Sequence, residues 1–211
     1  MASAPTFRGV LPRVSEKLLV QVLALCALAA TLPALASVVR VLPLPELVRR
    51  SQVVAVAEVE SSVSSWVDER IVTDSVLVVE DPLLGTAGGE RLTVRTLGGE
   101  VDGLGQRVFG EPWFRPGERY LLFLEPFPLA GSSRTPNPES LAPLLRPVGM
   151  SQGALPIVAS PEGPLVTPNA EQPALLDPCV EASLAAWLDA PRPLADALAE
   201  VREAVQEAQG N

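Results

Sequence analysis

The pattern of apolar and polar residues predicts four β-strands in the middle of this 211-residue chain. The segment from Gln52 to Trp66 begins with a continuous apolar run and then alternates, with Val59 and Val63 on one face and polar residues on the other. Such a strand is covered on both faces in its first half and meets water in its second half. The four expected strands are 52–66, 70–80, 91–97 and 118–125, and apolar residues on both faces of the last predict a central position.

Turn residues separate these strands. Residues 67–70 form a polar turn, Asp81-Pro82 is expected to end the second strand, and a glycine-rich loop is expected from Gly98 to Gly117. Further along, residues 126–178 contain 12 prolines, a density that excludes central strands and long helices. We expect only short extended pieces there, and one piece within 141–158 is expected to complete the sheet.

Helical patterns flank the β-rich part. Residues 43–51 are expected to form one or two helical turns, since Pro45 suits a first helical position. Near the C-terminus, Asp177-Pro178 predicts the start of a helix whose apolar residues recur at helical spacing. A second helix follows, with an apolar stripe of Leu194, Leu198, Val201 and Val205. We expect both stripes to pack on the domain's own sheet, and docking of a partner is the alternative.

The first 36 residues have the order of a Sec-type signal peptide. Three basic residues precede an apolar run from Leu18 to Ala30, and Ala34-Leu35-Ala36 forms a small-x-small cleavage site. Cleavage is therefore predicted after Ala36. An uncleaved membrane anchor and a lipoprotein attached at Cys26 are the alternatives, and the small-residue site favours cleavage over both.

Composition and charge exclude several kinds of function. The chain has 16 Lys+Arg, 25 Asp+Glu and no histidine, and cleavage leaves 13 arginines, no lysine, 24 acids and Cys179 as the one thiol. The net charge of −9 argues against nucleic-acid binding, which needs clustered basic residues. Without histidine, Ser-His-Asp catalysis is excluded and zinc lacks a ligand set, so we expect no metal and no cofactor. Cys179 is interpreted as a small hydrophobe near a helix start.

Carboxylates are the remaining catalytic candidates, because glycoside hydrolysis needs two of them. Asp74 interrupts the apolar face of the second strand, and we interpret it as an edge-strand charge that discourages aggregation. Asp102 is interpreted as a solvated loop acid and not as a calcium ligand. The candidates by location are Asp68, Glu69, Asp74, Glu80 and Asp81, and no catalytic residue is assigned among them.

The most suggestive binding feature is the aromatic group of Phe109, Trp113 and Phe114 within the glycine-rich loop. Exposed aromatic side chains on a loop are typical of contact surfaces. The alternative is that these rings cap one end of the sheet as part of the core. These three residues form the predicted binding site.

The order of elements over about residues 44–125 resembles a known family. The stretches that carry the resemblance are Arg49–Val59, Val78–Gly85, Leu92–Arg95 and Phe114–Leu124. They resemble the netrin-like module, the OB-type barrel of the tissue inhibitors of metalloproteinases, and are similar to uncharacterised secreted bacterial proteins with the same pattern. The resemblance implies a closed or nearly closed five-stranded barrel that serves binding. The predicted mature N-terminus is Ser37 where the family's inhibitors use a cysteine, so no functional residue carries over.

Together these observations predict a mainly β protein (α+β overall): a five-stranded OB-type barrel with a proline-rich wrap and two C-terminal helices. The expected organisation is a signal peptide at 1–36, the barrel at 37–158, a proline-rich linker at 159–176 and a helical tail at 177–209. We expect an exported, non-enzymatic binding domain, secreted or periplasmic, with an unidentified protein partner and no membrane contact after cleavage. A carboxylate-dependent hydrolase of the same compartments and a membrane-tethered structural protein are the alternatives.

Overall fold

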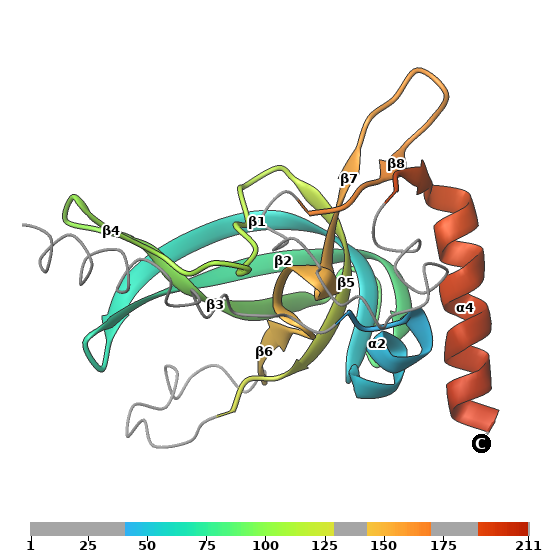
Figure 1. Ribbon diagram of the computed structural model, residues 1–211, viewed down its shortest axis with the longest axis horizontal. Coiled ribbons are helices and arrows are strands. Elements are labelled where there is room, and N and C mark those ends of the chain that lie inside the picture. The colour runs from blue at the N-terminus through green and yellow to red at the C-terminus, as the bar shows by residue number, and fades with distance from the viewer. Residues whose placement is uncertain (1–40, 129–142, 170–189, 211) are drawn as a thin grey trace, which may run out of the picture. The chain divides into compact units, whose positions relative to one another are not determined.

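The computed structural model describes residues 41–128, 143–169 and 190–210 (Figure 1). These residues are mainly β, with 49% of them in strands, together with two helices. The predicted cleavage site at Ala36, Cys179 and the helix expected to start at Asp177 lie outside the described residues. Within the described ranges, no helix is both long and apolar enough to cross a membrane.

Five strands pair into a closed ring. They are β1 (Val53–Val67), β2 (Arg70–Leu84), β3 (Arg91–Val101), β5 (Arg119–Pro126) and β6 (Leu144–Pro147). The ring runs β1–β2–β3–β6–β5 and returns to β1, and every pairing is antiparallel except that of β3 with β6. The four predicted strands and the short fifth piece are therefore confirmed, and β5 is central as expected.

Apolar side chains from all five strands fill the inside of the ring. Alternate residues of β1, such as Val53, Ala55 and Ala57, point inward and meet Leu122 and Leu124 of β5. Leu77, Val79, Leu92, Val94 and Leu145 complete this core from the other strands, together with Phe114 and Ala154. Burial of these side chains is the main force that holds the ring together.

Two helices cover the outer face of β1 and β5. They are α2 (Leu44–Arg50) and α4 (Leu194–Gly210), which lie side by side against this face (Figure 1). Val54 and Val56 of β1 point toward them, so the first half of β1 is covered on both faces as predicted. Val201 and Val205 of α4 are buried there, which confirms that its apolar stripe packs on the domain itself.

Short strands extend the sheet from β5. The 3-10 turn η1 (Met150–Gly153) leads into β7 (Ala154–Val158), which pairs with β5, and β8 (Leu165–Val166) and β9 (Arg192–Pro193) follow. The strand β8 lies within the span expected as a linker. The prediction that proline density excludes central strands was wrong for β6, which lies between β3 and β5. It is tolerated because Pro147 is its last residue and its pairing with β3 spans two residues.

Two predicted strand ends were wrong. The strand β2 continues through Pro82 to Leu84, where it pairs with β1 alone, and a residue without an N–H is tolerated at such an edge. Half of the expected glycine-rich loop is a hairpin, because β3 continues to Val101 and β4 (Leu104–Arg107) folds back on it. At Gly98 a Cβ would lie 2.6 Å from the Gln106 carbonyl oxygen, so this hairpin requires glycine there.

A β-bulge reverses the faces of β1 after Val59. The register with β2 shifts between Val59 and Ser61, so that Val59 points into the ring while Val63 lies on the outer face, 67% exposed. The prediction that these two valines share a face was therefore wrong. Asp74 is not an edge charge either, because β2 pairs with β1 on one side and β3 on the other at this position.

Candidate functional site

The three predicted aromatic residues do not form one surface. Phe109 is 85% exposed and Trp113 is 46% exposed, whereas Phe114 is buried. The Phe114 ring packs edge-on against Tyr120 with centroids 5.0 Å apart, inside the ring of strands. Phe114 therefore belongs to the core, and a contact role stays a prediction for Phe109 and Trp113.

Most of the carboxylates predicted as catalytic candidates are bound to arginines. Asp74 accepts two hydrogen bonds from Arg95, Glu80 pairs with Arg119, and Asp81 pairs with Arg202. Asp68 and Glu69 form the β1–β2 turn and Asp102 the β3–β4 turn, all three with left-handed backbone conformation. Among the described residues, no group of three or more Cys, Asp or Glu side chains could hold a metal ion.

A different part of the molecule combines a hollow with unusual charge. It is a cavity of about 590 Å³ at the point where β3 and β6 diverge beyond their two paired residues. We call it the arginine-lined cavity. Its lining residues are Arg50, Val67, Asp68, Arg70, Val72, Arg95, Leu97, Glu111, Glu125, Phe127, Pro128, Arg146, Pro147, Gly149 and Met150.

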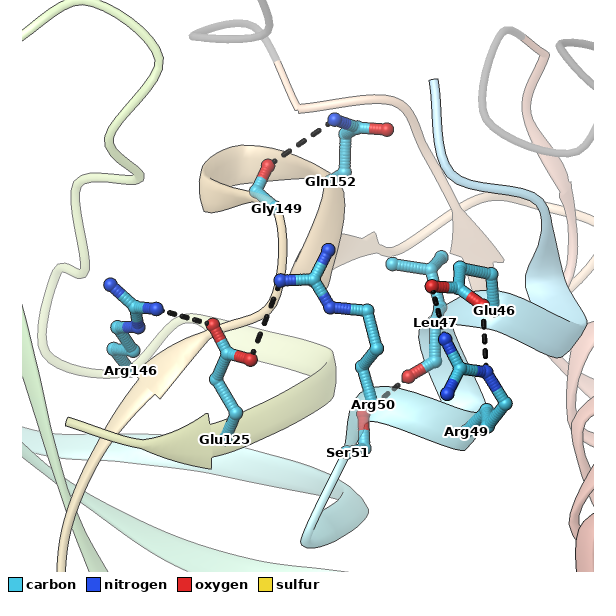
Figure 2. A network of polar contacts seen from close by, with 9 residues as sticks. All are labelled: Glu46, Leu47, Arg49, Arg50, Ser51, Glu125, Arg146, Gly149 and Gln152. Atoms are coloured by element: carbon cyan, nitrogen blue, oxygen red, sulfur yellow. Dashed lines mark hydrogen bonds and ion pairs between the residues drawn. The ribbon is translucent and has the colours of Figure 1, made fainter. Parts of the chain in front are cut away.

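Two arginines share one carboxylate at one side of this cavity. Glu125 on β5 lies directly across from Arg146 on β6, and an Arg146 nitrogen is 2.8 Å from a Glu125 oxygen. Arg50, the last residue of α2, reaches the other Glu125 oxygen at 3.6 Å (Figure 2). Glu125 is mostly covered, with 16% of its side chain exposed, while both arginines are more than a third exposed. This triad therefore presents one excess positive charge to the cavity.

Arg95 forms a second, neutral part of the wall. Its guanidinium donates two parallel hydrogen bonds of 2.7 Å to Asp74 and lies 5.6 Å from the centre of the Phe127 ring. Only 10% of the Arg95 side chain is exposed, and the bond to Asp74 raises its pKa further. These contacts hold the aromatic ring against the outer face of β3.

Glu111 contributes a half-buried acid. Burial raises the pKa of its carboxyl, and a hydrogen bond from the Leu97 backbone and the nearby Arg146 charge lower it in part. The loop that carries Glu111 is anchored where the Ser151 N–H donates to the Gly110 carbonyl at 2.8 Å. A proton is therefore held more readily here than on an exposed glutamate.

Hydrogen bonds of the Gln152 side chain stabilise the turn after β6. This buried side chain accepts a hydrogen bond from the Leu42 N–H at 2.9 Å and donates one to the Gly149 carbonyl at 3.3 Å (Figure 2). Gly149 and Met150 both have positive φ, and a Cβ at Gly149 would lie 2.8 Å from Leu42. The part of the cavity wall formed by Gly149 and Met150 is therefore bonded to the segment that leads into α2.

The charge of the cavity differs from that of the chain. Four arginines and three carboxylates line it, and Asp74, which binds Arg95 from outside the lining, brings the charges into balance, whereas the whole chain has 16 basic and 25 acidic residues. Arg70 makes no side-chain hydrogen bond or ion pair with any described residue and is exposed at the rim. Val72, Leu97 and Met150 add apolar surface between the charges. The cavity thus combines cationic groups with an apolar floor.

A second cavity of about 620 Å³ is lined by Trp113, Tyr120 and Ile157, among others. Its two arginines are paired with glutamates, Arg115 with Glu118 and Arg119 with Glu80. Burial and a hydrogen bond to Glu118 raise the pKa of the Tyr120 hydroxyl, so this group stays protonated as a donor. The lining of this second cavity also holds one more arginine than carboxylates, but both of its arginines are in ion pairs, whereas Arg70 of the arginine-lined cavity has no partner among the described residues.

Comparison with known proteins gives no relative from which residue roles could be carried over: no family model, curated protein or solved structure matches the sequence. The arginines of the cavity were missed by sequence reasoning. The available signal was that every basic residue after position 36 is an arginine, since arginine recognises carboxylates and phosphates in a planar, two-pronged way. Which arginines meet depends on the pairing of β3, β5 and β6, and the sequence pattern does not reveal it.

Proposed function

We propose that this protein is an exported, non-enzymatic binding domain built on an OB-type barrel, and that its ligand is an organic acid with an apolar part. The ring order supports the barrel. If the five ring strands β1, β2, β3, β5 and β6 are numbered one to five along the chain, they pair in the order 1-2-3-5-4, and the fourth pairs with the first. The third and fifth of them, β3 and β6, are parallel. That is the order of OB-type barrels.

The position of the arginine-lined cavity is the observation that carries the proposal. OB-type barrels bind ligands on the face of their second and third strands, between the first and fourth connections. Here Val72, Arg95 and Leu97 come from β2 and β3, while Asp68 comes from the β1–β2 turn. Phe127 comes from the start of the connection that follows β5. The cavity therefore lies where this fold class binds its ligands.

The chemistry of the wall indicates the kind of ligand. Guanidinium groups bind carboxylate and phosphate through charge-assisted hydrogen bonds, and Arg50, Arg70 and Arg146 keep exposed surface for this purpose. The apolar floor favours a ligand with a hydrocarbon part next to its acidic group. Hydrolysis by a carboxylate pair has less support, since both Asp74 oxygens are already bonded to Arg95.

Calorimetric titration with three probes tests this proposal. Octyl phosphate carries both head and tail, inorganic phosphate only the head, and 1-octanol only the tail, each used below the concentration at which micelles form. We expect octyl phosphate to bind at least tenfold more tightly than either of the others, because both parts of the cavity are engaged. Equal binding of all three, or none, would contradict the proposal, and turnover of a substrate lost on one carboxylate change would support the hydrolase.

Arginine variants assign the binding to this cavity. Arg70→Gln and Arg146→Gln are expected to weaken octyl phosphate binding about 10- to 100-fold each, as a lost charged hydrogen bond costs about 1.5–3 kcal/mol. Arg202→Gln is the matched control, because Arg202 lies on α4 and pairs with Asp81. A loss of equal size in the control would place binding elsewhere.

Export has its own test. N-terminal sequencing of the protein recovered from culture supernatant or periplasm is expected to begin at Ser37. A sequence that begins at Met1 in the membrane fraction would favour the tethered alternative.

A further inference from the structure

The half of β1 beyond Val59 has an open edge. From Val54 to Glu58 the strand pairs with both β2 and β5, and Val59 ends this double pairing through hydrogen bonds with Glu118 and Gly117. From Ser61 to Val67 it pairs with β2 alone among the described strands. In Figure 1 this part of β1 extends with β2 beyond the end of β5. The free edge presents unpaired backbone N–H and C=O groups.

This edge lacks the side chains by which proteins block edge strands. Residues 61–67 contain no charged residue, no proline and no glycine. Val63 is 67% exposed and Trp66 is 46% exposed, so the edge also carries apolar surface. An unpaired strand with these properties is a template for the addition of another strand, which supplies backbone hydrogen bonds along its length.

The sequence of the edge indicates which strand is added. Ser61-Ser62-Val63-Ser64-Ser65 reads the same in both directions. In antiparallel pairing about a two-fold axis at Val63, each residue faces its own kind: Val63 faces Val63, and Ser62 faces Ser64. Opposed β-branched residues and opposed serines are favourable pairs, and no two like charges meet between residues 61 and 65.

We propose that two copies of this chain associate through this edge, by antiparallel pairing of β1 centred on Val63. The two rings then share one continuous sheet in which β1 of each copy is flanked by β2 and by the other β1. The valine at the axis is covered on the outer face by its symmetry mate. Among residues 61–67 only Val67 lines the arginine-lined cavity, so the proposal stands independently of ligand binding.

Charge placed at Val63 tests the pairing and its register. Val63→Lys and Val63→Glu should each fold normally, because the side chain is exposed, but each puts two like charges directly opposite at the axis. We expect sedimentation velocity of the protein purified from cells expressing the full chain to show wild-type dimers. Each variant should dissociate at least tenfold more readily, and an equal mixture of the two should recover the dimer as a Lys–Glu pair.

The control is Leu104→Lys, which charges an exposed apolar residue of β4 and should leave the dimer unchanged. A monomeric wild type across the whole concentration series would overturn the proposal. So would dimers that survive in both single variants, or a mixture that stays monomeric. Binding of an extended peptide by a monomeric wild type would show that the edge serves a different partner.

Discussion

Three aromatic residues within six positions have different roles in this protein. Phe109 projects into solvent, Trp113 is half exposed, and Phe114 fills the ring core against Tyr120. The loop segment from 108 to 118 has no regular strand or helix, so no periodicity in the sequence distinguishes the buried aromatic side chain from the exposed ones. The sequence therefore identified the three aromatic residues as a group, but which of them is buried depends on tertiary packing.

Substitution of Phe114 separates these roles. Phe114→Ala is expected to lower the free energy of unfolding by about 3–5 kcal/mol, because it leaves a cavity in the ring and removes the edge-on contact with Tyr120. Phe109→Ala is the matched control and should change it by less than about 0.5 kcal/mol. Urea unfolding followed by circular dichroism measures both, and equal effects would contradict this assignment of core and surface.

Glu111 makes stability depend on pH with a definite sign. Since burial raises its pKa above the ordinary 4.5, the folded state binds the proton more tightly than the unfolded chain. Its contribution is therefore favourable at low pH and is lost as pH rises from the unfolded pKa through the raised folded pKa. Glu111→Gln should gain stability relative to wild type across this window, as measured by urea unfolding at a series of pH values.

Glu90, whose pKa is shifted in the opposite direction, provides the control for this measurement. The Thr86 hydroxyl donates to Glu90 and lowers the pKa of that carboxyl, with a further hydrogen bond from the Ala87 backbone. Glu90→Gln should therefore lose stability relative to wild type as pH rises. Parallel pH profiles for wild type and Glu111→Gln would contradict the account of Glu111.

At the scale of elements, strand cores were predictable and their irregularities were not. The pattern of apolar residues located β1, β2, β3 and β5, because the inward face of each is buried in the ring and the helices also cover β5 and the first half of β1 from outside. The bulge after Val59 shifts the alternation by one residue, and serines on both sides of Val63 give no sign of it. The extension of β2 through Pro82 depends on the absence of a second neighbour there, which is a property of the sheet.

The bend between β6 and β7 tests how tightly these elements are packed. At Gly153 a Cβ would lie 2.4 Å from the Val148 carbonyl oxygen and 2.8 Å from that of Phe123, both backbone atoms that cannot move aside. Gly153→Ala should therefore cost about 1–3 kcal/mol or more, the range of an overpacked core. Gly105→Ala is the control, since no atom lies within 4 Å of its added Cβ. Thermal unfolding of the two variants compares them, and an unchanged midpoint for Gly153→Ala would contradict this packing.

At the scale of the whole molecule, ring closure creates the candidate site. The arginine-lined cavity draws its wall from α2, from the β1–β2 turn and from all five strands of the ring, so its residues are spread from Arg50 to Met150. No local motif could predict such a site. The three aromatic residues predicted as the binding site, Phe109, Trp113 and Phe114, do not line this cavity. The sequence predicted the strands that form the cavity, and binding rather than catalysis remains our proposal.

A nuclear magnetic resonance titration with ¹⁵N-labelled protein and octyl phosphate tests the central claim most directly. Saturable shift changes are predicted at the backbone amides that surround the arginine-lined cavity, namely those of Arg70, Val72, Leu97, Phe127, Arg146 and Met150. The amides of Tyr120 and Ile157 in the second cavity should stay unchanged. Changes confined to the second cavity, or none at saturating probe, would contradict the assignment of the arginine-lined cavity as the binding site.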